Sequence, residues 1–95
     1  MSVLTDEQIS ERLAGVPGWA RQGDSIVHTE TLADFKAAIF FVGAVAYLAE
    51  AANHHPDITI QWNKVTLTLS THSAGGLTDN DFALAKQVTG LSKSE

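Results

Sequence analysis

The sequence predicts an α+β fold in which a four-stranded antiparallel sheet carries three helices packed on one face. Segments with the three- and four-residue spacing of helices alternate with pairs of short segments in which every second residue is apolar. Turn residues separate the members of each pair, which is typical of antiparallel hairpins. With 95 residues, of which 44% are hydrophobic, the chain has the size of one compact domain, and we assign residues 1–95 to it.

A first helix is expected from about Asp6 to Ala14. Thr5-Asp6-Glu7-Gln8 has the form of a capping box, and Leu4 and Ile9 stand at the positions of a hydrophobic staple. The glycines and proline of residues 15–18 end this helix. Two short strands should then form a hairpin around the turn residues 22–24, and they comprise residues 19–21 and 25–29.

A long apolar helix is expected from about Thr31. One face carries apolar residues at helical spacing, namely Phe35, Ile39, Val42, Ala46 and Ala49. Further apolar residues lie off this face, namely Phe40, Phe41, Val45 and Tyr47. The helix should therefore bury surface by self-association. Its most apolar stretch, Ala37–Ala49, is shorter than the roughly 20 residues that span a bilayer, so we expect no membrane segment.

A second hairpin and a last helix complete the pattern. Apolar residues alternate with polar ones on both sides of a turn expected at Asn63-Lys64, namely Ile58, Ile60 and Trp62 before it and Val65, Leu67 and Leu69 after it. Thr78 can cap the last helix and Asp81 can close its capping box, with Leu77 and Phe82 as the staple. Gly90 is the expected end of that helix.

Three of the four histidines lie in the second half of the chain, at His54, His55 and His72. A two-residue turn at Asn63-Lys64 would place His55 opposite His72. His72 would then share the polar face of its strand. Imidazole changes its charge near neutral pH, so three of them can supply both a proton donor and a proton acceptor. The cluster therefore favours acid/base catalysis.

Two other interpretations of the histidines stay open. They could simply be polar surface residues, or they could bind a metal together with Asp57, Asp81 or Glu50. The spacing matches no familiar metal motif. Asp81 has a structural role available as a helix cap, and Glu50 could orient His54 or be solvated. His28 has no companions in the sequence and is expected at the surface.

Composition and charge exclude several classes of function. A net charge of -5 with only six Lys and Arg residues argues against binding to nucleic acid or to an anionic membrane. Without Cys the chain can form neither a disulfide nor a thiolate metal site. The N-terminal residues lack the basic start and apolar run of a signal peptide, so a cytoplasmic location is expected.

Several segments at matching spacing resemble the signature of the pterin-4a-carbinolamine dehydratases. They are Glu50-Ala51-Ala52-Asn53-His54-His55-Pro56-Asp57, Trp62-Asn63-Lys64-Val65, Thr71-His72 and Gly76-Leu77-Thr78-Asp79-Asn80-Asp81. The likeness extends weakly through Gly18-Trp19 and Asp34-Phe35, and so covers nearly the whole chain. Some animal members have a Trp-Phe pair where this chain has Ile58-Thr59.

The resemblance implies a homo-oligomeric lyase, a dimer or a tetramer, with this same α+β fold. Its substrate would be 4a-hydroxytetrahydrobiopterin or a related pterin, dehydrated to the quinonoid dihydropterin to recycle the cofactor of aromatic amino acid hydroxylases. It would need no cofactor or metal. Its catalytic residues would be His54, His55 and His72, and its substrate-binding residues Glu50, Pro56, Asp57, Trp62 and Asp81. Because some members act as dimerisation partners of a transcription factor, a non-catalytic binding module is the alternative.

Overall fold

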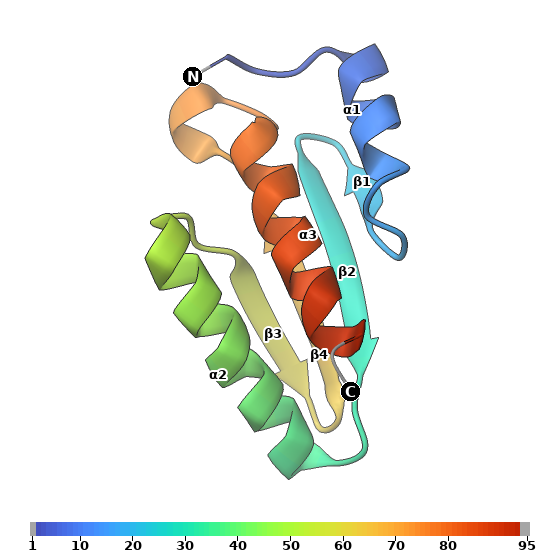
Figure 1. The fold of residues 1–95 in the computed structure, drawn as a ribbon, viewed down its shortest axis with the longest axis vertical. Coiled ribbons are helices and arrows are strands. Elements are labelled where there is room, and N and C mark those ends of the chain that lie inside the picture. The colour runs from blue at the N-terminus through green and yellow to red at the C-terminus, as the bar shows by residue number, and fades with distance from the viewer. Residues whose placement is uncertain (1, 94–95) are drawn as a thin grey trace.

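The computed structural model describes residues 2–93 and contains four strands and three α-helices (Figure 1). In chain order the elements are α1 (Asp6–Leu13), β1 (Ala20–Gln22), β2 (Ser25–Thr31), α2 (Phe35–Ala52), β3 (Asp57–Gln61), β4 (Lys64–Leu69), the 3-10 helix η1 (His72–Ala74) and α3 (Asp79–Lys93). The strands form one antiparallel sheet in the order β1-β2-β4-β3. The predicted α+β class is confirmed.

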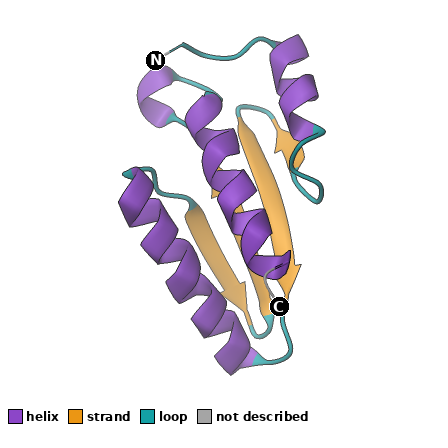
Figure 2. Ribbon diagram, viewed as in Figure 1, coloured by secondary structure: helices purple, strands orange, loops and turns teal. Residues whose placement is uncertain are grey.

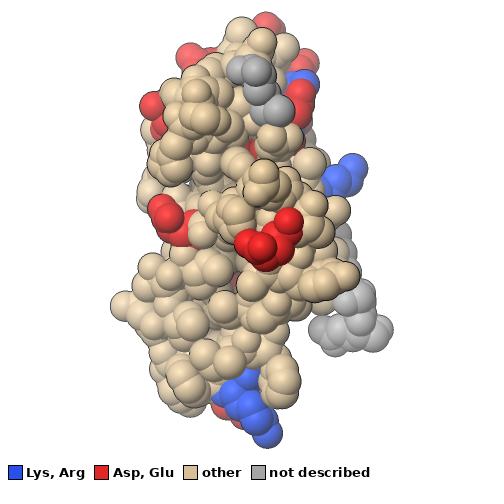
Figure 3. All heavy atoms as spheres, turned by 90° about the vertical axis from the view of Figure 1, so that its left-hand side faces the viewer, with Lys and Arg blue, Asp and Glu red and all other residues tan. Residues whose placement is uncertain are grey.

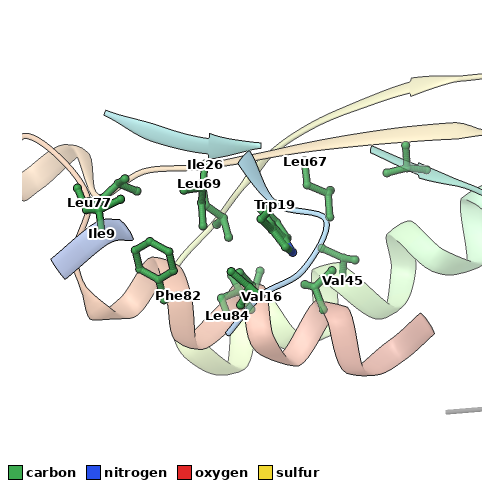
Figure 4. Packing of buried hydrophobic residues seen from close by; sticks show 14 of the residues in the cluster. Ile9, Val16, Trp19, Ile26, Val45, Leu67, Leu69, Leu77, Phe82 and Leu84 are labelled. Atoms are coloured by element: carbon green, nitrogen blue, oxygen red, sulfur yellow. The ribbon is translucent and has the colours of Figure 1, made fainter. Parts of the chain in front are cut away.

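The helices lie together on one face of the sheet, with α3 across its middle strands and α2 beside α3 (Figures 1 and 2). The core fills the space between sheet and helices (Figure 4). Val65, Leu67 and Leu69 of β4 have no exposed surface, and Ile26 of β2 pairs with Leu69 on the same face. Alternation along these strands therefore decides which side chains point toward the helices.

The first helix and hairpin follow the sequence closely. The Gln8 backbone N–H donates to Thr5 Oγ1 at 3.1 Å, and the Thr5 backbone N–H donates to Gln8 Oε1 at 2.9 Å, which completes the capping box. Leu4 and Ile9 are both buried, as expected for a staple. Strands β1 and β2 pair with Gln22 opposite Ser25, so the hairpin prediction is confirmed.

The long helix begins later and buries a different face than predicted. Thr31 still belongs to β2, and α2 follows Asp34, whose Oδ1 accepts a hydrogen bond from the Ala37 N–H at 2.8 Å. Of the predicted stripe, Ala49 is buried and Val42 is half-buried, whereas Phe35, Ile39 and Ala46 are exposed. The other buried residues of α2 are Ala38 and Val45, which lie off that stripe. Because α2 is apolar on nearly every side, periodicity alone cannot identify its buried face. Packing against the sheet and α3 selects that face.

The exposed side of α2 is unusually apolar. Four large side chains are exposed there, namely Phe35, Ile39, Phe40 and Tyr47, and charged residues are sparse on this side of the molecule (Figure 3). By length and composition alone, the 18-residue helix is apolar enough to cross a membrane, in contrast to the shorter stretch considered from sequence, and 17% of it is buried. Core helices of soluble proteins and signal sequences meet the same criterion. Val45 is fully buried and is no part of this surface.

The second hairpin turns one residue earlier than predicted. Gln61 pairs with Lys64, so Trp62 and Asn63 form the turn, and Trp62 adopts a left-handed φ of 53°. Ile60 consequently faces Val65 rather than Leu67. Strand β3 starts at Asp57 and β4 ends at Leu69, so His55 and His72 lie outside the strand pairing and do not face one another across it. The predicted register was wrong because a bulky residue took the turn position usually left to Asn or Gly.

Helix α3 begins as predicted and ends later. The Thr78 backbone N–H donates to Asp81 Oδ2 at 2.9 Å, and the Asn80 N–H donates to Thr78 Oγ1 at 3.3 Å. The expected end at Gly90 is wrong, because the helix continues to Lys93. A single glycine costs a helix only about 1 kcal/mol, which the packing of Val88 and Leu91 against the core can offset.

Candidate active site

The end of helix α2 fixes the position of His54. Asn53 adopts a left-handed conformation with φ 51° and ψ 43°, which Asn tolerates better than most residues. Its N–H donates to the Glu50 carbonyl at 3.2 Å, and the His54 N–H donates to the Ala49 carbonyl at 3.0 Å. This pair of bonds is a Schellman motif. It turns the chain so that His54 leaves the helix beside the start of α3.

His54 and Asp81 form a buried imidazole–carboxylate pair. His54 Nε2 lies 2.5 Å from Asp81 Oδ1. The two side chains are 11% and 0% exposed. A short, largely desolvated contact of this kind is strong and fixes the orientation of the ring. Asp81 therefore combines the predicted capping role with a contact to a candidate catalytic histidine.

His55 pairs with a different carboxylate, that of Glu50. His55 Nε2 lies 2.6 Å from Glu50 Oε2, and these side chains are 55% and 77% exposed. Glu50 was considered from sequence as a partner that could orient His54, but its contact is with the next histidine. The two neighbouring histidines leave the chain toward different partners, as the alternation of side chains in extended backbone predicts.

His72 lies at the same end of the molecule and forms no hydrogen bond with His54 or His55. It opens η1 and is exposed, so its predicted place on the polar face of the strand is wrong. The neighbouring residue, Thr71, donates its hydroxyl to Asp81 Oδ2 at 2.8 Å. A bridge between Thr71 and Gly76 closes the loop, and Gly75 at φ 81° makes its turn. His72 is thus linked to the His54–Asp81 pair through Thr71.

The remaining residues predicted for substrate binding divide between the two ends of β3. Pro56 and Asp57 follow the histidines directly and begin the strand. Trp62 lies at the far end, about 17 Å away for a five-residue strand, and is 66% exposed. Within one chain, Trp62 is therefore not brought together with the histidines.

His28 is not the isolated surface residue that the sequence predicts. Its Nδ1 lies 2.9 Å from the Gly18 carbonyl oxygen and its Nε2 lies 2.8 Å from Glu30 Oε1, and its ring stacks on Trp19 at 5.3 Å. Gly18 has φ 92°, and a Cβ there would come within 3.2 Å of the ring. The signal was available: His28 is two residues from buried Ile26 and so shares its face of the strand.

A hollow of about 410 Å³ lies elsewhere, between α1 and α3. Asp79 and Phe82 help to line it, whereas Asp81 points about 200° around the helix from Asp79, toward His54. Among residues 2–93, no group of three or more His, Asp or Glu side chains is arranged to hold a metal ion. The histidine and carboxylate side chains at this end of the molecule belong to the residue types that can take part in proton transfer.

The fold and the site define a small α+β protein with a buried imidazole–carboxylate pair at one end of its sheet. A sequence pattern described as pterin 4 alpha carbinolamine dehydratase matches residues 2–91. A protein of Roseiflexus castenholzii named "Putative pterin-4-alpha-carbinolamine dehydratase" is 59% identical over 87 residues, which are 92% of this chain and 94% of that protein. The chain belongs to the pterin-4a-carbinolamine dehydratase family.

Solved structures agree with this assignment. The crystal structure of a transcriptional coactivator/pterin dehydratase from Brucella melitensis superposes with a TM-score of 0.91 at 30% identity, covering 95% of this chain and 98% of that one. A pterin dehydratase-like protein described as a RuBisCO assembly factor in the alpha-carboxysome has a TM-score of 0.69 at 24% identity, covering 85% and 96% of the two chains. The second likeness supports the fold alone.

Proposed function

We propose that this protein dehydrates a 4a-hydroxytetrahydropterin to the quinonoid dihydropterin by histidine acid/base catalysis. The C4a–O bond breaks and the N5–H bond is lost, so that a C4a=N5 double bond forms and water leaves. The departing oxygen must gain a proton while N5 must lose one. Two differently placed proton-transfer groups therefore suit the reaction.

The observation that carries this proposal is the buried contact between His54 and Asp81 at 2.5 Å. A buried carboxylate that accepts from one ring nitrogen selects the tautomer and leaves the other nitrogen as the base, as in Ser-His-Asp sites. We assign His54 Nδ1 as the base that takes the N5 proton. His72, exposed on η1, then protonates the leaving oxygen, and His55 contacts and orients the pterin.

We also propose a metabolic role and a cellular location for this reaction. A regenerated quinonoid dihydropterin can be reduced again, so the enzyme would recycle the pterin cofactor of an aromatic amino acid hydroxylase. The acidic composition and the absence of Cys are compatible with a cytoplasmic enzyme that does not act on nucleic acid or at a membrane.

The exposed side of α2 supports self-association as part of the same proposal. Phe40 and Tyr47 are 73% and 76% exposed, and a contiguous apolar surface of this kind usually marks an interface. A second copy of the chain offers the same surface in return, which is the simplest closed arrangement. We propose a homo-oligomer, a dimer or a tetramer, that buries this side of α2.

The same surface also favours the alternative class, a binding module without catalysis. A partner helix with an apolar face would be the matching ligand. This alternative predicts that a chain with His54, His55 and His72 all replaced by Ala keeps its biological activity. The dehydratase proposal predicts that this triple variant loses it.

The direct test is an assay of the purified protein with enzymatically generated carbinolamine. The carbinolamine also dehydrates spontaneously, so turnover is measured as the excess over a protein-free reaction. We expect saturable catalysis by the wild-type protein. A rate equal to the protein-free background at every protein concentration would reject the proposal.

A further inference from the structure

Behind the His54–Asp81 pair lies a buried cluster of hydroxyl groups. Asp81 and Thr78 are 0% exposed and Thr71 is 7% exposed. Thr71 Oγ1 lies 2.8 Å from Asp81 Oδ2 and also 2.8 Å from Thr78 Oγ1. Threonine hydroxyls shielded from water at such distances must satisfy one another and the carboxylate.

The hydrogen bonds of this cluster run in one direction. A hydroxyl has a single proton to donate, and a carboxylate can only accept. Because Thr71 donates to Asp81, the hydroxyl of Thr78 must donate to Thr71. The Asn80 N–H then donates to Thr78 Oγ1 at 3.3 Å. The chain of donors therefore ends on the carboxylate of Asp81.

Helix capping does not account for the last step of this chain, in which the Thr71 hydroxyl donates to Asp81. The cap of α3 needs only the bond from the Thr78 N–H to Asp81 Oδ2, which is 2.9 Å long. Thr71 lies outside the helix, between β4 and η1, and its hydroxyl adds a second donor to the same oxygen. With Oδ2 held from two sides, Oδ1 is fixed toward His54 Nε2.

We propose that Thr71 and Thr78 are positioning residues, whose hydroxyls hold Asp81 so that His54 keeps its proton on Nε2 and transfers protons through Nδ1. This inference rests on the proposed dehydratase function. Groups that orient a ligating or catalytic histidine through its carboxylate commonly contribute substantially to activity. Thr71 is the decisive position because its hydroxyl contacts Asp81 directly.

The experiment compares Thr71→Val, which keeps the shape and loses the hydroxyl, with Thr71→Ser, which keeps the hydroxyl. A hydrogen bond to a charged group corresponds to a loss of about 10- to 100-fold in kcat when it is removed. We expect this loss in Thr71→Val with KM changed less than about 2-fold, because binding contacts are untouched. Thr71→Ser should retain most of the wild-type kcat.

A second readout needs no pterin. The short His54–Asp81 hydrogen bond should give a proton resonance far downfield of the backbone amides, absent in His54→Ala. The resonance should shift or broaden in Thr71→Val and remain in Thr71→Ser. If the wild-type protein has no dehydratase activity, the proposed function fails while this spectrum still tests the hydroxyl chain.

Three results would overturn the inference. The first is a folded Thr71→Val protein with wild-type kcat and an unchanged downfield resonance. The second is a fall in kcat/KM of Thr71→Val that comes entirely from a higher KM, with kcat unchanged. If Thr71→Val does not fold, Thr71→Ala takes its place in the experiment. The third result is that neither variant folds while Thr71→Ser does, which would show that the hydroxyl acts in folding instead of positioning.

Discussion

His54 and His55 are neighbours in the chain, and each has its Nε2 within 2.6 Å of a carboxylate oxygen. The two pairs differ in burial: His54 and Asp81 are 11% and 0% exposed, whereas His55 and Glu50 are 55% and 77% exposed. Exposed pairs are screened by water and contribute little, while a buried pair is costly to disrupt. The distance alone thus does not reveal which histidine the fold holds rigid.

The largest expected difference between the two histidines is in catalysis. Removing a proton-transfer group typically lowers the rate about 100- to 10,000-fold, so His54→Ala and His72→Ala should each lose most of their kcat. His55→Ala should mainly raise KM, because it removes a binding contact. Steady-state assays separate these outcomes, with circular dichroism to verify folding and Gln87→Ala, an exposed position on α3, as control. Wild-type rates in both His54→Ala and His72→Ala would contradict the assignment.

His28→Ala gives a different kind of control. A lone surface histidine would be replaceable without effect, but His28 stacks on Trp19 and contacts Glu30. We expect His28→Ala to lower the free energy of unfolding by about 1 to 2 kcal/mol, with kcat of the folded protein unchanged. Urea denaturation measures the first quantity. If the urea midpoint of His28→Ala equals that of the wild-type protein, these contacts contribute nothing to stability.

The two carboxylates should differ in their contribution to stability. Asp81 accepts hydrogen bonds from His54, the Thr71 hydroxyl and the Thr78 N–H. In Asp81→Asn the side-chain NH2 group, itself a donor, would face at least one of these donors. We expect Asp81→Asn to lower the free energy of unfolding by about 2 kcal/mol. Glu50→Gln should lower it by less than about 0.5 kcal/mol. Equal destabilisation in urea melts would refute the distinction between the pairs.

The exposed side of α2 can be tested without disturbing the core. Phe40→Asp introduces a charge at a side chain that is 73% exposed, so it should shift the light-scattering mass toward the monomer while the fold persists. Val45→Asp is the matched contrast, because it places the same charge in the interior and should unfold the chain. A wild-type protein that is monomeric at all practical concentrations would refute the proposed interface.

The smallest expected effect is that of chelators. If the histidines act as acids and bases, EDTA should leave the activity unchanged, and elemental analysis should find no stoichiometric zinc or iron. About one bound metal per chain, lost together with activity, would reassign His54 and His55 as ligands.

Local chemistry explains what could be predicted from the sequence. The capping boxes at Thr5 and Thr78 and the hairpin at Gly23 depend on residues within a few positions of one another, and all three are present. The three histidines and Asp81 were identified as candidates by their residue types and by the resemblance to the dehydratases. His54 and Asp81 are 27 positions apart, so only the folded chain could pair them.

Tertiary packing explains what could not be predicted. The buried face of α2 was misassigned because nearly every side of that helix is apolar. The hairpin register depended on whether Trp62 would accept a left-handed conformation, which its residue type disfavours. Alternation predicted that His54 and His55 point apart, but which of them meets Glu50 depends on how the chain leaves α2 after Asn53.

The role of the buried His54–Asp81 pair is tested most directly by comparing kcat in Asp81→Asn and Glu50→Gln, with the spontaneous dehydration subtracted. We expect kcat of Asp81→Asn to fall about 100- to 10,000-fold, because His54 loses the group that fixes its tautomer. Glu50→Gln should keep kcat within about 3-fold, since its exposed carboxylate does not hold a catalytic ring rigid. Equal kcat values in the two folded variants would contradict the claim that burial of the His54–Asp81 pair makes His54 the catalytic base.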